Sequence, residues 1–408
     1  MKNEPPIYRF EKFDNNWLFV KISDVARQFK TGGTPSTKEP TFWGGTIPWI
    51  QSSDIQKDIL FGVIPQKFIS EEGLQNSSAK LIPKNSIAIV TRVGVGKLAI
   101  IDQDYATSQD FLSLSDFNGD TQFLVYSIYR MLQKESTQLQ GTSIKGITKE
   151  DLLSKKISLP LIEEQSAIGS LFHTLDGLLA SYKDNLANYQ SLKATMLSKM
   201  FPKAGQTVPE IRLDRFEGEW EINKLNKYLT VSKKKNTQQK FGKEDVLSVS
   251  GEVGIVNQIQ FQGRSFAGVS VEMYSIVDTG NIVYTKSPLK ANPYGIIKTN
   301  YGIPGIVSTL YAVYLPNENV FPGFVERYFE NDLRLNSYLK PLVNKGAKND
   351  MKVSDENALL GNVIFPKLEE QVAISDYFTN LDKFIQSHKD KISQLETLKK
   401  KLLQDMFI

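Results

Sequence analysis

The strongest constraint on the fold is an internal repeat. Aligned without a gap at an offset of 206, residues 159–201 and 365–407 are identical at 17 of 43 positions. Unrelated segments of ordinary composition match at roughly one position in fifteen to twenty. The identities include a Pro, a Glu-Glu-Gln triplet and a closing Met-Phe. The chain therefore contains a tandem duplication, and the two halves are expected to share one frame.

The repeat extends beyond these segments. "RFEKFDNNW", which ends at Trp17, parallels "RLDRFEGEW", which ends at Trp220, and "GTSIKGITKEDL" from Gly141 parallels "GAKNDMKVSDENAL" from Gly346. Each half therefore has an aromatic entry, a diverged middle of about 130 residues, a Gly-rich approach and a long helix. The predicted domains are globules at 1–158 and 204–364, each followed by a helical segment, at 159–203 and 365–408.

The repeated segments predict two long helices. Pro160 and Pro366 suit helix starts, and the Glu pairs that follow lie in the first turn, where carboxylates favour the positive end of the helix dipole. Apolar residues recur at spacings of 3 and 4, which is typical of a coiled-coil seam; the expected seam positions are 168, 171, 175, 178, 182, 189, 192 and 196, and 374, 377, 381, 384, 395, 398 and 402. Each helix would be about 55 Å long at 1.5 Å per residue. Pairing of the two helices is preferred, and the alternative is that each covers a sheet of its own domain.

Composition excludes several kinds of site. The chain has no Cys and only two His, so disulfides, Cys-ligated zinc and His-based catalysis are not expected. A net charge of +4 is too small to indicate nucleic acid by itself, so any such site must be a local patch. We expect no membrane span, because no run of roughly 18 apolar residues occurs, and we expect a cytoplasmic protein.

Three short motifs suggest enzymes but are incomplete. "VGVGK", which ends at Lys97, lacks the upstream Gly and the following Ser or Thr of a phosphate loop, so a Gly turn is preferred. "ANPYG", from Ala291, lacks the second Pro of the base-holding loop of an amino-methyltransferase. "DMK", from Asp350, lacks a second acid for a nuclease metal site.

The two middles predict α+β globules with binding chemistry. Short β-branched runs broken by Gly and Pro indicate strands and turns. Residues 30–55 form a loop rich in Thr, Ser, Gly and Lys, which offers hydroxyl and backbone donors to phosphates. The tryptophans of this loop could equally be core anchors. The candidate DNA-binding residues are Lys30, Thr31, Thr34, Ser36, Lys38, Ser52, Ser53, Arg92, Lys97 and Gln109 in the first middle, and Lys233, Lys234, Lys235, Arg264, Ser265, Lys286 and Lys298 in the second.

The pattern resembles a known family. The stretches "VKISDVARQFKTGGTPS" and "WGGTIPWIQSSDI", together with the doubled Glu-Glu-Gln helix starts, are similar to the specificity (S) subunit of type I restriction-modification systems. The resemblance covers essentially the whole chain. It implies a fold of two α+β target recognition domains separated by two long antiparallel coiled-coil helices, related by a pseudo-twofold.

The resemblance also implies a division of labour. Each globule would read one half of a bipartite site in double-stranded DNA, and each helical spacer would dock one modification subunit. Restriction/translocase subunits would join through the complex. S-adenosylmethionine, ATP and Mg would be bound by the partner subunits, and this chain would hold no cofactor and no metal. The expected docking residues are Glu163, Glu164, Gln165, Phe172, Glu369, Glu370, Gln371 and Phe378.

The predicted helix length limits the spacing of the two half-sites. A spacer of about 55 Å, at about 3.4 Å per base pair, would set their centres no more than about 16 base pairs apart. Two other classes stay open from the residues alone: a non-enzymatic coiled-coil scaffold that binds protein partners, and a self-contained DNA enzyme.

Overall fold

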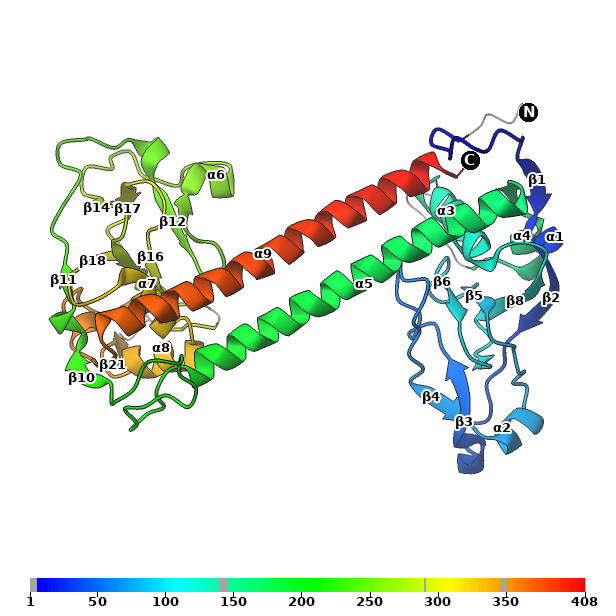
Figure 1. Ribbon diagram of the computed structural model, residues 1–408, viewed down its shortest axis with the longest axis horizontal. Helices are drawn as coiled ribbons and strands as arrows, with labels where there is room; N and C mark the ends of the chain where they lie inside the picture. Colours follow the sequence, from blue (N-terminus) through cyan, green and yellow to red (C-terminus); the bar gives the residue numbers. More distant parts are fainter. Residues whose placement is uncertain (1–5, 139–145, 290, 346–350, 408) are drawn as a thin grey trace. The chain divides into compact units, whose positions relative to one another are not determined.

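The computed structural model describes residues 6–138, 146–289, 291–345 and 351–407. The predicted Gly-rich approaches at 141–145 and 346–350 lie outside these residues. The chain forms two compact units, unit 1 from 1–183 and 390–408, and unit 2 from 184–389. Each unit takes part of both long helices, α5 (Ile162–Lys199) and α9 (Leu368–Asp405) (Figure 1).

Unit 1 has two main sheets. One has the order β2-β8-β5-β6 and is antiparallel throughout, and the other has the order β4-β3-β7, in which β3 and β7 run parallel. A separate antiparallel pair joins β1 to β9. The strands are β1 (Leu18–Lys21), β2 (Ala26–Thr31), β3 (Trp43–Ile50), β4 (Lys67–Ile69), β5 (Ser86–Val90), β6 (Leu98–Ile101), β7 (Ala106–Thr107), β8 (Phe111–Phe117) and β9 (Lys156–Leu159). The helices before α5 are α1 (Ile22–Val25), η1 (Pro40–Phe42), α2 (Glu71–Gln75), α3 (Thr121–Gln138) and α4 (Lys149–Ser154).

Strand β5 explains why unit 1 has two cores. It lies between β8 and β6 and is buried along its whole length, so alternate side chains point to opposite faces. Ile87 and Ile89 join the core that contains α3 and the long helices. Ala88 and Val90 join a smaller core beneath the loops. The sheet therefore separates a helical layer from a loop layer.

Unit 2 repeats this plan. Its main sheet has the antiparallel order β11-β18-β15-β16, and β10 pairs with β21 as β1 pairs with β9. Its additional sheets are the pairs β12-β13, β14-β17 and β19-β20. The strands are β10 (Glu221–Lys224), β11 (Leu229–Val231), β12 (Leu247–Ser250), β13 (Gly254–Asn257), β14 (Ser275–Val277), β15 (Ile282–Tyr284), β16 (Ile297–Thr299), β17 (Gly305–Val307), β18 (Ala312–Pro316), β19 (Asn344–Lys345), β20 (Met351–Lys352) and β21 (Asn362–Phe365). The helices are η2 (Leu225–Lys227), η3 (Lys243–Asp245), α6 (Gln258–Gln262), α7 (Pro322–Phe329), α8 (Asp332–Leu339) and η4 (Asn357–Leu359).

Strand β15 takes the place of β5 in unit 2. Ile282 and Tyr284 join the helical core, and Val283 joins the smaller one. The predicted fold class, two α+β globules with two long antiparallel helices in a tandem repeat, is confirmed.

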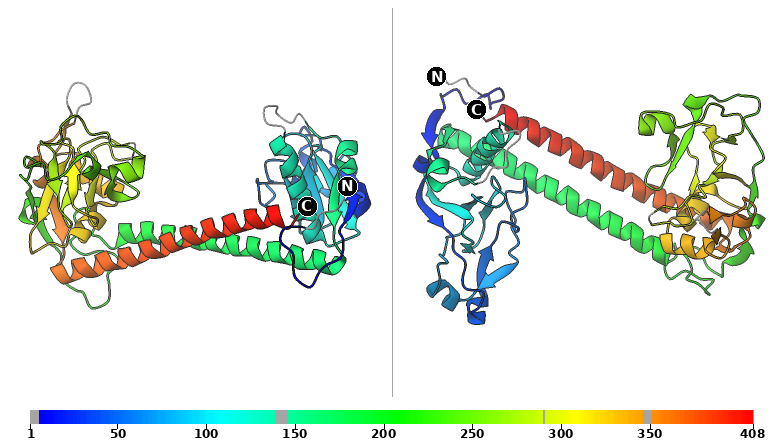
Figure 2. Two further views of the ribbon diagram at one scale, coloured as in Figure 1. Left: turned by 90° about the horizontal axis from the view of Figure 1, so that it is seen from above. Right: turned by 180° about the vertical axis from the view of Figure 1, so that it is seen from behind.

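The two long helices run antiparallel within each unit (Figure 2). In unit 1, the rings of Phe172 on α5 and Phe407 after α9 lie 5.5 Å apart, and Asp176 contacts Lys399. In unit 2, Tyr189 stacks on Phe384 at 5.9 Å. Residues with higher sequence numbers on α5 therefore contact residues with lower sequence numbers on α9.

The predicted seam was only partly correct. Leu178, Leu192, Phe384 and Leu398, all predicted seam positions, are 38–55% exposed. Burial in unit 1 instead includes Phe172 and Leu179, because the first half of α5 also covers the domain core. The helices therefore both pair and cover their own domains, which combines the two alternatives. No helix among the described residues is long and apolar enough to cross a membrane.

Candidate nucleic-acid interface

Backbone hydrogen bonds in unit 1 gather four loops that carry most of the predicted DNA-binding residues. Gly33 N donates to Thr107 O (2.9 Å), Ser108 N to Ile50 O (3.0 Å) and Thr91 N to Asp110 O (2.7 Å). These bonds tie the loop after β2 and the end of β3 to the segment from Thr107 to Asp110, which also meets the end of β5. Loops distant in sequence are therefore fixed beside one another.

Two glycines permit this close approach. A Cβ atom on Gly32 would lie 2.1 Å from Thr107 Oγ1, and one on Gly33 would lie 2.2 Å from Ser78 O. Any larger residue at either position would force the loops apart. The Gly-Gly pair is thus required by packing, and the Thr and Ser residues that follow it are held near the sheet.

The predicted residues of unit 1 divide by exposure. Thr31, Thr34, Ser36, Lys38, Ser53, Arg92 and Gln109 are exposed, whereas Lys30, Ser52 and Lys97 are half-buried. The Nζ atom of Lys97 donates to Ser52 O at 3.2 Å, so these two predicted residues are brought together. The Nζ atom of Lys30 donates instead to Leu81 O at 3.0 Å. Their role in DNA binding stays a prediction.

The predicted loop at 30–55 is wrong in part, because Trp43–Ile50 form strand β3. The two tryptophans of this strand anchor the loop that precedes it. Trp43 and Trp49 make an edge contact with ring centroids 5.1 Å apart, and their indole N–H groups donate to Ser36 O and Gly33 O at 3.0 Å each. The Nζ atom of Lys67 lies 5.9 Å from both rings. The anchor interpretation is thus confirmed for both residues, and Lys67 is a basic residue of this region that the sequence pattern did not reveal.

In unit 2, two of the three lysines in the basic run at 233–235 already bind side chains of the unit. The Nζ atom of Lys234 pairs with Asp278 (3.0 Å) and that of Lys235 donates to Ser275 Oγ (2.8 Å), whereas Lys233 is exposed. Arg264 is exposed, and Ser265 beside it is half-buried.

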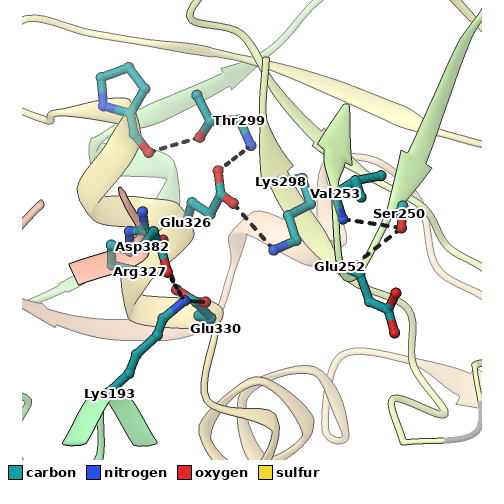
Figure 3. A network of polar contacts seen from close by, with 11 residues as sticks. Lys193, Ser250, Glu252, Val253, Lys298, Thr299, Glu326, Arg327, Glu330 and Asp382 are labelled. Atoms are coloured by element: carbon teal, nitrogen blue, oxygen red, sulfur yellow. Dashed lines mark hydrogen bonds and ion pairs between the residues drawn. The ribbon is translucent and has the colours of Figure 1, made fainter. Parts of the chain in front are cut away.

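The remaining two lysines lie apart from this run. The Nζ atom of Lys286 pairs with Asp355 at 2.6 Å. Lys298 is only 8% exposed, and its Nζ atom pairs with Glu326 Oε1 at 3.2 Å (Figure 3). Glu326 also accepts from Thr299 N at 3.0 Å. The structure therefore corrects the surface position expected for Lys298, because its charge is neutralised inside the unit.

Exposed apolar side chains in unit 2 were missed. From the turn of the β12-β13 hairpin to β14 the chain exposes large hydrophobic residues, which sequence periodicity cannot distinguish from core residues: Val253, Ile259, Phe261, Phe266, Val269 and Met273. Val269 is 97% exposed. Apolar side chains gathered on a surface mark interaction sites.

The predicted docking residues of unit 1 have internal roles. Glu164 is 1% exposed and accepts from Arg9 Nε and Nη2, both at 2.7 Å. Gln165 accepts from Asp120 N (3.0 Å) and donates to Pro160 O (2.9 Å). Phe172 is fully buried. We call the Arg-Glu-Gln arrangement the clasp of the unit.

Unit 2 has the same clasp. Arg212 donates to both oxygens of Glu370 at 2.8 and 2.7 Å, and Gln371 accepts from Phe321 N (2.9 Å) and donates to Pro366 O (2.9 Å). Phe378 is fully buried. Six of the eight predicted docking residues are therefore buried in their own unit, and Glu163 and Glu369 are exposed. The repeated Arg, eight residues before each Trp, was the sequence signal that could have revealed the clasp.

A second polar cluster fixes the helices in unit 2. Arg327 and Lys193 each pair with both Glu330 and Asp382, at 2.5–2.8 Å (Figure 3). Burial alone would raise the pKa of Glu330, but the Arg327 and Lys193 charges hold that pKa below its usual value. The cluster thus joins α5, α7 and α9 within the unit.

Two of the incomplete motifs form turns. Gly94 and Gly96 of "VGVGK" have φ of 88° and 91°, as expected for a Gly turn. In "ANPYG", Gly295 N donates to Asn292 O at 3.0 Å, and Gly295 has φ of 90°. Asp350 of "DMK" lies outside the described residues.

Comparison with known proteins agrees with this architecture. Residues 14–188 match the family model of the type I restriction modification DNA specificity domain. The chain is 33% identical over 166 residues to the type I restriction enzyme EcoR124I/EcoR124II specificity subunit of Escherichia coli, covering 38% of this chain and 40% of that one. It is 25% identical over 242 residues to the MjaIX specificity subunit of Methanocaldococcus jannaschii, covering 56% of this chain and 55% of that one. These matches thus span about half or less of either relative.

A solved structure shows the same fold over nearly the whole chain. The S subunit of a type I restriction-modification system from M. genitalium superposes with a TM-score of 0.61 at 15% identity, covering 99% of both chains. Residues 14–188 are therefore similar to the type I restriction modification DNA specificity domain, and the whole chain shares the fold of a solved S subunit.

Proposed function

We propose that this chain is the sequence-specific DNA-recognition subunit of a type I restriction-modification complex. The observation that carries the proposal is that two units share a frame and differ in their loops. Both have the same four-stranded sheet order and the same clasp, while their additional sheets are unrelated in topology. A repeated frame with diverged loops suits a reader of two different half-sites.

Each unit would read one half of a bipartite site in double-stranded DNA. Exposed Lys, Arg, Ser and Thr of the gathered loops would contact phosphates and fix the register. Arg92 and Gln109 in unit 1, and Arg264 in unit 2, are exposed residues of the types that read guanine or adenine edges.

The long helices would dock two modification subunits, and restriction/translocase subunits would join through them. The buried clasp residues cannot supply that docking surface directly. Exposed residues of the helices would do so, among them Glu163, Glu369 and the exposed seam residues Leu178, Leu192, Phe384 and Leu398. Adenine methylation with S-adenosylmethionine, and cleavage with ATP and Mg, would belong to those partner subunits, and this chain would be non-catalytic.

An exchange of one unit's reading portion tests the proposal. Residues 1–158 would be replaced by the corresponding segment of another specificity subunit and the chimera assembled with the modification subunits. We expect methylation-site sequencing to show a change in one half-site only. A change in both halves would exclude independent reading, and methylation by the chain alone would exclude a non-catalytic role.

Helix length provides a second test. Each long helix has 38 residues, or about 57 Å at 1.5 Å per residue. We expect deletion of one heptad from both helices to shorten the non-specific gap while each half-site sequence is retained. The same methylation-site sequencing measures the gap, and an unchanged gap would mean that the helices do not set it.

A further inference from the structure

A small cavity in unit 1 has the properties of an anion site. It has a volume of about 240 Å³ and lies among α3, β9 and Phe407, which is two residues beyond the end of α9. Its wall includes Ser127, Arg130 and Lys134 from α3, Lys156 and Ser158 from β9, and Phe407. We call it the Arg130 cavity. It shares no predicted DNA-binding residue with the loops described above.

The guanidinium of Arg130 has a buried donor that no described residue satisfies. The acid in the wall is Glu135, and its Oε1 atom accepts from Lys155 Nζ at 2.6 Å. Among the described residues, Arg130 forms no ion pair, and its Nε atom is buried without a hydrogen-bond partner. Asp405 attracts the guanidinium without pairing with it. A buried guanidinium N–H without an acceptor carries a desolvation cost that a bound anion would remove.

A second unsatisfied polar atom belongs to the same cavity. Ser158 is 4% exposed, and its Oγ atom is buried without a hydrogen-bond partner among the described residues. A hydroxyl buried in this way usually has a partner. The wall therefore offers a hydroxyl donor from one side and a guanidinium donor from the other.

The electrostatics of α3 agree with an excess of positive charge. Burial lowers the pKa of Arg130. Burial, together with the neighbouring charge of Arg130, lowers the pKa of Lys134.

Unit 2 shows what closes such a space. Phe123 and Phe324 occupy equivalent positions, because each contacts the Trp of its entry strand and the Phe that ends a long helix. Four residues further on, unit 1 has Ser127 and unit 2 has Tyr328. The Tyr328 ring lies 5.8 Å from Phe201 and 5.0 Å from Phe365, and its hydroxyl accepts from Ile364 N at 3.4 Å.

The Tyr328 ring of unit 2 thus fills the place where Ser127 leaves the cavity open, and the two serines of the wall are specific to unit 1. Strand β21 places Ile364 where β9 places Ser158, since both precede the last strand residue before the helix Pro. A purely apolar cavity would not require serine at positions 127 and 158.

We propose that the Arg130 cavity binds a phosphate oxyanion. A guanidinium presents paired N–H donors that match phosphate oxygens, and ammonium groups add charge without fixed geometry. Arg130 would supply the paired donors, Ser127 and Ser158 would donate through their hydroxyls, and Lys134 and Lys156 would balance the second charge. The inference does not depend on DNA recognition by the loops.

A phosphate bound in the Arg130 cavity would contact segments that are far apart in the sequence. The cavity joins α3, the strand that precedes α5 and the end of α9 within unit 1. A ligand that binds only the folded state stabilises it according to its concentration and affinity.

The test uses the full chain and inorganic phosphate. Calorimetric titration and the unfolding temperature would be measured against chloride at matched ionic strength. Three variants would be compared: Ser127→Tyr, which copies the residue of unit 2, Arg130→Gln, and the control Lys149→Gln on exposed α4. We expect saturable binding by the wild type and Lys149→Gln, at least about tenfold weaker binding by Arg130→Gln, and none by Ser127→Tyr.

Separate outcomes identify or exclude the ligand. A linear, unsaturated rise in unfolding temperature shared by all variants would mean general salt exclusion and would overturn the proposal, as would equal binding of acetate, which would indicate a carboxylate site. Displacement of phosphate by duplex DNA would assign the site to backbone phosphate, and phosphate binding unaffected by DNA would assign it to a free phosphate compound. If Ser127→Tyr fails to fold, the phosphate affinities of Arg130→Gln and Lys149→Gln still test the proposal.

Discussion

Units 1 and 2 are alike where each holds the long helices and different where each presents loops. In both, an Arg eight residues before a Trp pairs with a buried Glu of the next helix: Arg9 with Glu164, and Arg212 with Glu370. In both, a Gln adjacent to that Glu bridges the start of the helix to the domain. The shared part is thus a joint between globule and helix.

The difference begins at the outer face of the main sheet. Unit 1 builds a three-stranded sheet with a parallel pair there, whereas unit 2 builds two hairpin-like pairs and α6. Both outer layers pack on a small core of their own, separated from the helical core by the main sheet of the unit. A loop layer with a separate core can change without disturbing the joint, which explains why the repeat is visible in the helices and lost in the middles.

The largest predicted effect comes from removal of the Tyr328 ring, which is present in the helical core of unit 2 and has Ser127 in its place in unit 1. Tyr328→Ser would open in unit 2 the space that Ser127 leaves in unit 1. Tyr328 is 7% exposed and contacts the rings of Phe201 and Phe365. We expect a loss of about 4 kcal/mol in the unfolding free energy of unit 2, as for other large-to-small aromatic changes. Urea-dependent hydrogen exchange, read from peptides of each unit, measures the two units separately.

The control for this variant is Phe261→Ser, at a surface ring that is 48% exposed. A similar loss in both variants, or a loss confined to unit 1, would contradict the equivalence of Ser127 and Tyr328.

Breaking the clasps tests whether the two joints are equal. Arg9→Ala and Arg212→Ala each leave a buried carboxylate unpaired, with side-chain exposures of 1% for Glu164 and 4% for Glu370. We expect each to lower the unfolding free energy of its own unit by about 3 kcal/mol, the low end of the range for a broken buried pair. The same exchange measurement applies, with exposed Lys12→Ala as the control. Unequal losses would show that one joint alone holds its helix.

A pH titration distinguishes the polar clusters on the long helices. The pKa of Glu330 is held below its ordinary value of 4.5 by Arg327 and Lys193, against the effect of burial. The carboxylate's contribution is therefore complete above pH 4.5 and is lost as the pH falls through the folded-state pKa. We expect the stability of unit 2 to fall with pH in that range, and Glu330→Gln to make the fall shallower. An unchanged slope in the variant would assign the acid sensitivity to other carboxylates.

The domain plan could be predicted from the sequence because it occurs twice, as an internal repeat. The two helices and the α+β class follow from local periodicity and from the repeat. The helices begin two residues after the predicted starts at Pro160 and Pro366. The role of Glu164 could not be predicted from local pattern, because its partner Arg9 lies 155 residues away. The same holds for Lys298, whose burial depends on Glu326 in α7.

The predicted seam failed for a related reason. A helix that faces both a partner helix and a domain core buries a wider stripe than a heptad describes. Phe172 and Leu179 face the core of unit 1, while Leu178 stays exposed. The DNA-binding residues stay a prediction, since exposure and residue type alone do not show which side chains contact bases.

The smallest predicted effect concerns an ion pair that unit 1 forms and that has no counterpart among the described residues of unit 2. Asp176 and Lys399 in unit 1 correspond, at the repeat offset, to Asp382 and Lys193 in unit 2, and both pairs form. The Lys183–Glu396 pair of unit 1 has no such counterpart, because Gln190 stands at the position equivalent to Glu396.

Exposure separates the two pairs of unit 1. The side chains of Lys183 and Glu396 are 55% and 52% exposed, whereas those of Lys399 and Asp176 are 12% and 19% exposed. Solvent screens the first pair, so a double-mutant cycle to Ala should give a coupling energy below about 1 kcal/mol. The cycle on Lys399 and Asp176 should give a larger value, because Asp176 also accepts from the Tyr126 hydroxyl at 2.6 Å. Equal couplings would mean that burial does not set the strength of these pairs, and that the repeated pair has no special part in holding the helices together.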